Sequence, residues 1–277
     1  MRYKSRFKMS LDLKVLIRGG GEMATGVAHR LARAHFKVCM TEIAQPLAVR
    51  REVSFSEAIY DGEKEVEGIL ARYARTLEEI SLEWEKKAIP ILVDPEASIK
   101  TELKPDVLVD ATLAKKNLGT RLSDAPLVIG LGPGFRAGED VHMIVETNRG
   151  HHLGRLILKG CAQEDTGVPG PMGGYTLERV LRAPLPGKVT HVRKIGELLK
   201  VGDPVLYVED TPVKARIPGV LRGLIRQGIQ VPEGIKVGDI DPRGTLENCY
   251  TISEKARAIA GGVLEGILMI FNKAHPR

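Results

Sequence analysis

The feature that most constrains the fold is a glycine-rich turn within residues 17–26, placed between an apolar run and a helical pattern. Residues 15–17 are apolar and lead into the glycines, which is typical of a buried strand. Residues 22–36 repeat apolar side chains at helical spacing, and residues 37–43 form a second strand-like run. Because glycine permits a sharp turn, this stretch predicts a strand, a turn, a helix and a second strand.

The glycine turn also matches a dinucleotide-binding fingerprint. Gly19, Gly21 and Ala24 occupy the three fixed positions of the pattern G-x-G-x-x-G/A. A helix that begins there offers free N–H groups to a pyrophosphate, and an acid at the end of the second strand commonly binds a ribose hydroxyl. We therefore expect a phosphate site at Gly19, Gly20, Gly21, Glu22 and Ala24, with Glu42 binding the ribose. The alternative is a unit whose glycines serve only the packing of helix on strand.

Three further strands are predicted, at residues 88–94, 105–112 and 125–135. Residues 63–87 repeat apolar side chains at helical spacing, so we expect one long helix there. The last of the three strands ends in a second glycine turn that contains Gly132 and Gly134. Since ligands bind at the carboxyl ends of parallel strands, this turn would form the opposite lip of a cleft.

Two adjacent arginines, Arg50 and Arg51, follow the second predicted strand. Paired guanidinium groups can hold a phosphate or carboxylate through parallel hydrogen bonds, so both are candidates for an anion clamp. A pair of solvated surface charges is an equally good interpretation of the same residues.

Residues 141–147 and 153–160 predict an antiparallel hairpin that carries four polar candidates. His142 and Glu146 share one face of the first strand, and His151 and His152 lie at the tip. They are weak candidates for acid/base catalysis. Surface histidines are the default interpretation, and we expect no metal.

Composition favours a small anionic ligand over nucleic acid. The formal net charge is +6, but the 41 Lys and Arg residues are dispersed among 35 acids and form no basic stripe with aromatics. Three widely spaced cysteines indicate reduced thiols, and the basic segment 1–10 has no apolar core of a signal peptide. The apolar run at 261–271 is too short for a bilayer, so we expect a cytoplasmic protein without membrane contact.

The second half of the chain contains an internal repeat. Residues 183–205 match residues 215–237 without a gap at an offset of 32, which indicates two copies of one strand–turn–strand unit. The first copy resembles the biotinyl/lipoyl-carrier family, which implies a barrel-sandwich hybrid over 183–240. Lys214 lacks the neighbours of the modified lysine in that family, so no biotin or lipoate is expected on it.

Six stretches resemble the YqeB-like family of accessory proteins of selenium-dependent molybdenum hydroxylase systems: residues 17–26, 50–62, 130–135, 146–155, 166–174 and 236–244. That family is more distantly similar to the XdhC-type chaperones of molybdenum cofactor. The resemblance implies a maturation factor, with a molybdenum hydroxylase or its cofactor-loading machinery as partner. It leaves open whether the protein is an enzyme.

These patterns together predict an α/β fold in four parts. A Rossmann-like, mostly parallel sheet domain at 1–162 is followed by a Gly/Pro-rich linker at 163–180, a small all-β barrel-sandwich hybrid domain at 181–245 and a C-terminal helix at 246–277 that packs back on the first domain. The expected ligand is NAD, NADP or a molybdopterin nucleotide. An NAD(P)-dependent oxidoreductase and a non-catalytic protein-binding module are the alternative functions.

Overall fold

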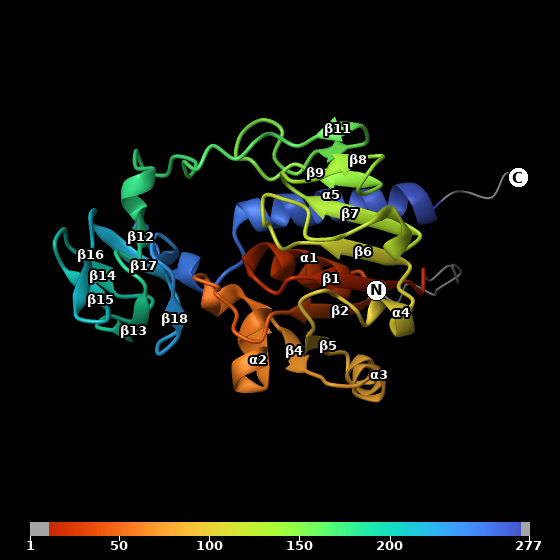
Figure 1. The fold of residues 1–277 in the computed structure, drawn as a ribbon, viewed down its shortest axis with the longest axis horizontal. Helices are drawn as coiled ribbons and strands as arrows, with labels where there is room; N and C mark the ends of the chain where they lie inside the picture. The colour runs from red at the N-terminus through yellow and green to blue at the C-terminus, as the bar shows by residue number, and fades with distance from the viewer. Residues whose placement is uncertain (1–10, 273–277) are drawn as a thin grey trace, which may run out of the picture.

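The computed structural model describes residues 11–272, so the segment 1–10 discussed above lies outside the described part. Its largest element is a nine-stranded sheet in the order β10-β9-β7-β6-β1-β2-β5-β4-β3 (Figure 1). The strands are β1 (Lys14–Arg18), β2 (Lys37–Glu42), β3 (Glu63–Val66), β4 (Ile69–Tyr73), β5 (Ile89–Val93), β6 (Val107–Asp110), β7 (Leu127–Leu131), β9 (Met143–Val145) and β10 (Leu156–Ile157). The neighbours from β4 to β9 pair in parallel, whereas β3 and β10 pair antiparallel at the two edges. The short strands β8 (Arg136–Ala137) and β11 (Gly160–Cys161) form a separate pair.

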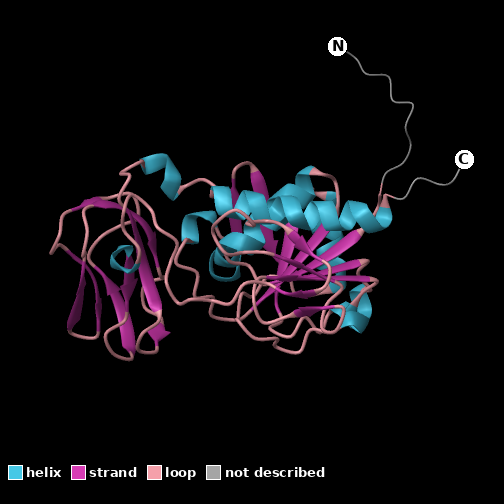
Figure 2. Cartoon of the chain, turned by 90° about the horizontal axis from the view of Figure 1, so that it is seen from above, coloured by secondary structure: helices cyan, strands magenta, loops and turns pink. Residues whose placement is uncertain are grey.

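Apolar side chains cover both faces of this sheet, as expected for parallel strands. On one face Val15 and Ile17 pack with the helices α1 (Glu22–Arg33) and α5 (Glu254–Phe271), which lie along the sheet in Figure 2. The other face carries α3 (Leu77–Glu85). The remaining helical segments are α2 (Ala58–Asp61), α4 (Lys100–Leu103) and the 3₁₀ turns η1 (Arg51–Val53), η2 (Phe55–Glu57), η3 (Leu122–Asp124), η4 (Leu177–Arg179) and η5 (Leu246–Cys249). No helix within residues 11–272 is long and apolar enough to cross a membrane.

Helices α1 and α5 run parallel and in close contact. Gly26 of α1 faces Ala256 of α5, and Arg30 one turn later faces Gly261. A Cβ atom at Gly26 would lie 2.8 Å from the Cβ of Ala256, so the close approach requires glycine there. Consequently the N-termini of both helices lie at the same end of the pair.

The second region contains two four-stranded sheets, β12-β19-β17-β14 and β16-β15-β13-β18. Their strands are β12 (Val180–Arg182), β13 (Gly187–His191), β14 (Leu198–Leu199), β15 (Pro204–Val208), β16 (Thr211–Lys214), β17 (Gly219–Leu224), β18 (Gln230–Val231) and β19 (Lys236–Asp241). The predicted repeat is confirmed for the pairing of β13 with β18 and of β17 with β14. Gly187 pairs with Val231 and Gly219 with Leu199, so the partners correspond at the offset of 32 in both directions. No helix interrupts residues 180–241, all of which are described.

The predicted fold class is nevertheless wrong. In place of a self-contained, mostly parallel Rossmann-like domain followed by a barrel-sandwich hybrid, the structure has one large mixed sheet, antiparallel at both edges, whose face is completed by the C-terminal helix. The long helix predicted at 63–87 is also wrong, because this segment forms the hairpin β3–β4 and then α3. The cause is a two-residue turn at Glu67 and Gly68, where both residues have positive φ, as hairpins require.

The segment before η1 joins the two regions. The backbone N–H of Leu224 donates to the Val49 carbonyl at 2.8 Å, and Val49 itself lies in the core of the second region. Arg226 extends from the second region to the carboxylates of Glu57 and Asp61. These contacts hold one face of the second region against the carboxyl edge of the large sheet.

Candidate functional site

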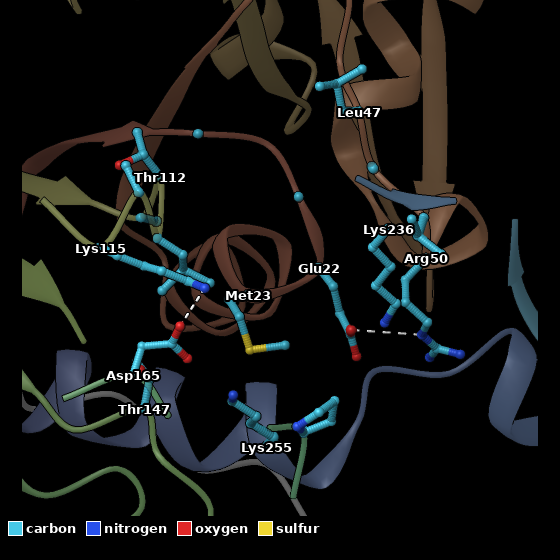
Figure 3. Close-up of a pocket in the computed structure, with 18 of the residues that line it drawn as sticks. Glu22, Met23, Leu47, Arg50, Thr112, Lys115, Thr147, Asp165, Lys236 and Lys255 are labelled. Atoms are coloured by element: carbon cyan, nitrogen blue, oxygen red, sulfur yellow. Dashed lines mark ion pairs between the residues drawn. The ribbon is translucent and has the colours of Figure 1, made fainter. Parts of the chain in front are cut away.

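A cavity of about 1060 Å³ lies between the carboxyl edge of the large sheet and the second region (Figure 3). The glycine turn, the segment after β2 and the loop after β6 form its first wall. The loop 163–170 and the charged face of β17 and β19 form the second wall, and the first turn of α5 closes the floor.

Positive side chains predominate in this cavity. Its nine cationic residues are Arg18, Arg50, Lys115, Arg149, Arg179, Arg182, Arg222, Lys236 and Lys255. Its five acidic residues are Glu22, Glu42, Glu96, Glu164 and Asp165. Several of the cations already have partners: Arg149 pairs with Glu254, and Lys115 pairs with Asp165. The excess of positive charge favours an anionic ligand.

The predicted glycine turn lies in the wall of the cavity, but packing explains most of it. Gly19 has φ of +108°, and a Cβ there would lie 3.0 Å from the carbonyl oxygen of Ala111. The N–H of Gly20 donates to the Glu42 carboxylate at 2.8 Å. Around Gly21 the structure leaves open space, so within this turn Gly21 offers a ligand the closest approach.

Glu42 is engaged by the protein itself. One carboxylate oxygen accepts from Gly20 and the other accepts from the Ile43 N–H at 2.8 Å. Burial raises the pKa of this carboxyl group, while the two backbone donors oppose the shift. A ribose at this position would therefore share an acceptor that already binds the glycine turn.

Arg50 and Arg51, the two predicted clamp residues, have different surroundings. Arg50 is only 6% exposed and donates to the carbonyls of Asn248 (2.7 Å) and Thr251 (3.1 Å). Its Nε lies 3.6 Å from a Glu22 oxygen and has no hydrogen-bond partner. Arg51 donates to the Leu224 carbonyl at 2.7 Å and lies outside the cavity wall. Arg50 is thus the clamp candidate that lies in the cavity wall and whose buried Nε donates no hydrogen bond.

The second glycine turn contributes mainly through its backbone shape. Gly132 and Gly134 have φ of +75° and +106°, a region that glycine favours. Side chains on them would overlap Thr147 and the backbone of Lys116, respectively. Between them Pro133 lies in the cavity wall.

The histidine candidates do not assemble into a site. His142 accepts from the Val128 N–H at 3.0 Å, and His151 and His152 are exposed and pack edge to face. Glu146 is buried and accepts from two backbone N–H groups, those of Asn148 at 2.7 Å and Gln163 at 2.8 Å. None of the four belongs to the cavity wall, and within residues 11–272 no three His, Cys, Asp or Glu side chains are grouped to hold a metal ion.

A buried ionic cluster on the second wall was not predicted from sequence. Asp239 is fully buried and accepts from Arg222 Nε at 2.7 Å, Arg179 Nη1 at 2.9 Å and Lys236 Nζ at 2.9 Å. Burial alone would raise the pKa of Asp239, but the three cations hold it far below its usual range. A comparison of the two repeat copies could have identified this cluster, because the first copy has Tyr207 and Thr190 where the second has Asp239 and Arg222.

Lys255 was also missed. It lies half-buried in the first turn of α5, where Ser253 caps the helix by accepting from the Ala256 N–H at 3.3 Å. A positive charge near a helix N-terminus is unfavourable because of the helix dipole, so a lysine in this turn is the sequence feature that could have identified Lys255 as a candidate. Figure 3 shows its amine directed into the cavity.

Comparison with known proteins gives a similar protein but no activity. No protein-family model matches the chain. Over 259 residues the chain is 49% identical to the uncharacterized protein YqeB of Escherichia coli (strain K12). This likeness supports a YqeB-like family. The alignment covers 94% of this chain and 48% of that protein, so the chain spans about half the length of the curated relative it matches.

Solved structures show only distant likeness. The product-bound ectoine utilization protein EutE (DoeB) from Ruegeria pomeroyi is 13% identical with a TM-score of 0.25, over 83% of this chain and 85% of that one. The same shares of the two chains align with an aspartoacylase family protein from Mesorhizobium loti, at 12% identity and a TM-score of 0.27. At TM-scores this low, the likeness supports no inference about reaction, substrate or metal.

Proposed function

We propose that the cavity binds a phosphate-bearing small molecule, a nucleotide or a molybdopterin-type ligand, and that the protein acts as a maturation factor for a selenium-dependent molybdenum hydroxylase. The observation that carries the binding proposal is Arg50, a buried guanidinium in the cavity wall whose Nε has no hydrogen-bond partner. A buried, unsatisfied donor is costly, and an anionic oxygen is its natural partner.

The surroundings of Arg50 support a phosphate at this position. The parallel helices α1 and α5 both begin at the cavity, and each contributes the positive end of its dipole. Lys236 and Lys255 extend their amines toward the same space in Figure 3. Glu22 lies near Arg50, so a bound phosphate would displace this weak 3.6 Å pairing and satisfy the guanidinium instead.

The volume and the lining distinguish between ligand classes. A cavity of about 1060 Å³ is at the upper end of ordinary ligand pockets, which suits a nucleotide or a pterin nucleotide better than free phosphate. No histidine lines it within residues 11–272, so a common proton donor of hydride-transfer enzymes lies outside the site. This favours an accessory role over an NAD(P)-dependent oxidoreductase. The link to the hydroxylase rests on the sequence resemblance.

Thermal denaturation with pyrophosphate, ADP, CTP, NAD, NADP and molybdopterin nucleotides tests the binding. A ligand at about 100 times its Kd stabilises the folded state by roughly 2.7 kcal/mol, and we expect such a shift with at least one of them. Arg50→Lys keeps the charge and loses Nε, so it should weaken that shift. The matched control Arg51→Lys changes a residue outside the cavity wall and should leave it intact. No shift with any compound would exclude the phosphate site.

The hydroxylase role is tested separately in the host. We expect deletion of the gene to leave the molybdenum hydroxylase present as protein but inactive. Normal hydroxylase activity in the deletion strain would contradict the role, whatever the purified protein binds.

A further inference from the structure

Lys255 stands out among the cations of the cavity because it has no partner. Within residues 11–272 it makes no hydrogen bond and no ion pair, whereas Arg149 pairs with Glu254 and Lys236 donates to Asp239 at 2.9 Å. It is half-buried, and it lies in the turn of α5 where a positive charge is disfavoured by the helix dipole.

The charged groups around Lys255 come from five segments of the chain. Arg149 and Lys236 are the nearby cations, and Glu22, Glu146 and Asp165 are the nearby acids, of which Asp165 pairs with Lys115. Glu146 is occupied by two backbone donors, so its carboxylate is not available to pair with the amine. Burial, followed by the charge of Arg149, lowers the pKa of Lys255. Desolvation and a neighbouring cation are the two conditions that make a lysine amine nucleophilic near neutral pH.

We propose that Lys255 is a nucleophilic amine that captures a carbonyl group of the ligand as an imine. The inference rests on the proposed function, because the phosphate held near Arg50 and the helix N-termini would bring the carbonyl to the amine. The ligand class is therefore a phosphate-bearing aldehyde or ketone.

The reaction balances without a cofactor. The lone pair of Nζ attacks the carbonyl carbon, and the π electrons of the C=O bond move to the oxygen, which takes a proton. The resulting carbinolamine loses water, so that one C=N bond replaces the C=O bond and the two amine hydrogens leave with the oxygen. Glu22 lies 3.6 Å from Arg50 Nε and its charge acts on Lys255, so we assign it the proton transfer from the attacking nitrogen to the departing oxygen. Hydrolysis reverses the sequence and releases the ligand.

Pyridoxal 5′-phosphate is a suitable probe, because it is a phosphate-bearing aldehyde. The full chain is incubated with it, reduced with borohydride to fix any imine as a secondary amine, and mapped by peptide mass spectrometry. We expect Lys255 to carry most of the label, because its lowered pKa leaves more of the amine uncharged and the phosphate site holds the aldehyde beside it. Pyrophosphate should compete with the labelling.

Two variants make the result specific. Lys255→Arg keeps the positive charge but cannot form the imine, and it should lose the label with an unchanged melting temperature. Lys236→Arg changes another of the three lysines of the cavity, Lys115, Lys236 and Lys255, and should retain label on Lys255. Mapping the unmodified protein needs no variant, so the proposal stays testable even if Lys255→Arg folds poorly. Label spread evenly over exposed lysines, or concentrated on Lys236, would overturn the proposal.

The two proposals fail in different ways. If pyrophosphate stabilises the protein but Lys255 is not labelled, the phosphate site stands and the imine does not. If neither stabilisation nor labelling occurs, both are wrong. Labelling that pyrophosphate does not compete would also overturn the inference, because the phosphate would then not position the aldehyde.

Discussion

Replacing Asp239 with asparagine is the sharpest test of how the second wall of the cavity is held. The substitution keeps the shape of the side chain and removes the one negative charge shared by Arg179, Arg222 and Lys236. Both arginine side chains are less than a tenth exposed, so water cannot replace the lost carboxylate.

The magnitude follows from the burial of these partners. Removing one member of a buried ionic cluster costs about 3–5 kcal/mol, because Arg179 and Arg222 lose their principal counter-ion and Arg222 keeps only Asp241, at 3.6 Å. For a chain of this size each kcal/mol corresponds to roughly 2–4 °C in Tm, so we expect Asp239→Asn to lower Tm by about 6–20 °C.

The pH dependence gives a second, independent readout. The pKa of Asp239 is lowered by folding, so its contribution is fully present above the unfolded pKa of about 3.9 and is lost as pH falls below it. Urea denaturation between pH 7 and pH 3 should therefore show a steeper loss of stability in the natural protein than in Asp239→Asn.

Asp210→Asn is the matched control, because Asp210 lies exposed in the turn of the first repeat copy. It should change stability by no more than about 0.5 kcal/mol. If Asp239→Asn behaves like this control at pH 7, or if the acid limbs of the two proteins coincide, the ionic cluster does not stabilise the fold as argued.

Three shorter predictions concern the helix pair and its surroundings. Gly26→Val should destabilise by about 1–3 kcal/mol, because its side chain collides with Ala256, and an unchanged Tm would contradict the packing. Gly21→Leu should leave Tm within about 1 °C, since the space around Gly21 is open, but should abolish the pyrophosphate-induced Tm shift. Glu67→Gln should cost about 0.2–1 kcal/mol in urea denaturation, because the carboxylate accepts from the partly exposed Arg257 at 2.7 and 2.8 Å; equal midpoints would refute this.

Periodicity predicted the individual strands of the large sheet better than their assembly. The strands at 89–93, 107–110 and 127–131 were found because each is a short apolar run bounded by turn residues. The prediction of one long helix at 63–87 was wrong, because the apolar residues there have helical spacing although the turn at Glu67 and Gly68 reverses the chain. A non-glycine residue with positive φ is hard to recognise from sequence. Tertiary packing therefore determines that residues 63–87 form a hairpin and a short helix.

The glycine motif correctly placed the candidate site at the carboxyl edge of the sheet, but it identified only part of the site. Glycines at the fingerprint positions let the backbone come close to a ligand. In this chain Gly19 packs closely against Ala111 and Gly20 against Ser56 instead. Six of the nine cationic side chains of the cavity come from residues 149–255, which are distant in sequence from the turn. Such a site forms where the second region packs against the carboxyl edge of the large sheet. Sequence periodicity cannot predict that packing.

The repeat explains why the charges on β17 and β19 are informative about function. Both copies form an antiparallel strand pair, β13 with β15 and β17 with β19, and the second pair differs by a bulge at Arg222. The first pair forms with Thr190 and Tyr207 at the positions of Arg222 and Asp239, so a strand pair of this kind does not require the two charges. The face of the first copy stays open to solvent, whereas the equivalent face of the second lies against the carboxyl edge of the large sheet. Burying an ionic cluster stabilises a protein less than burying well-packed apolar side chains of similar size. Its presence on only one of two equivalent faces is therefore best explained by the cavity it lines, where Arg222 and Lys236 give an anionic ligand a positive and rigid wall.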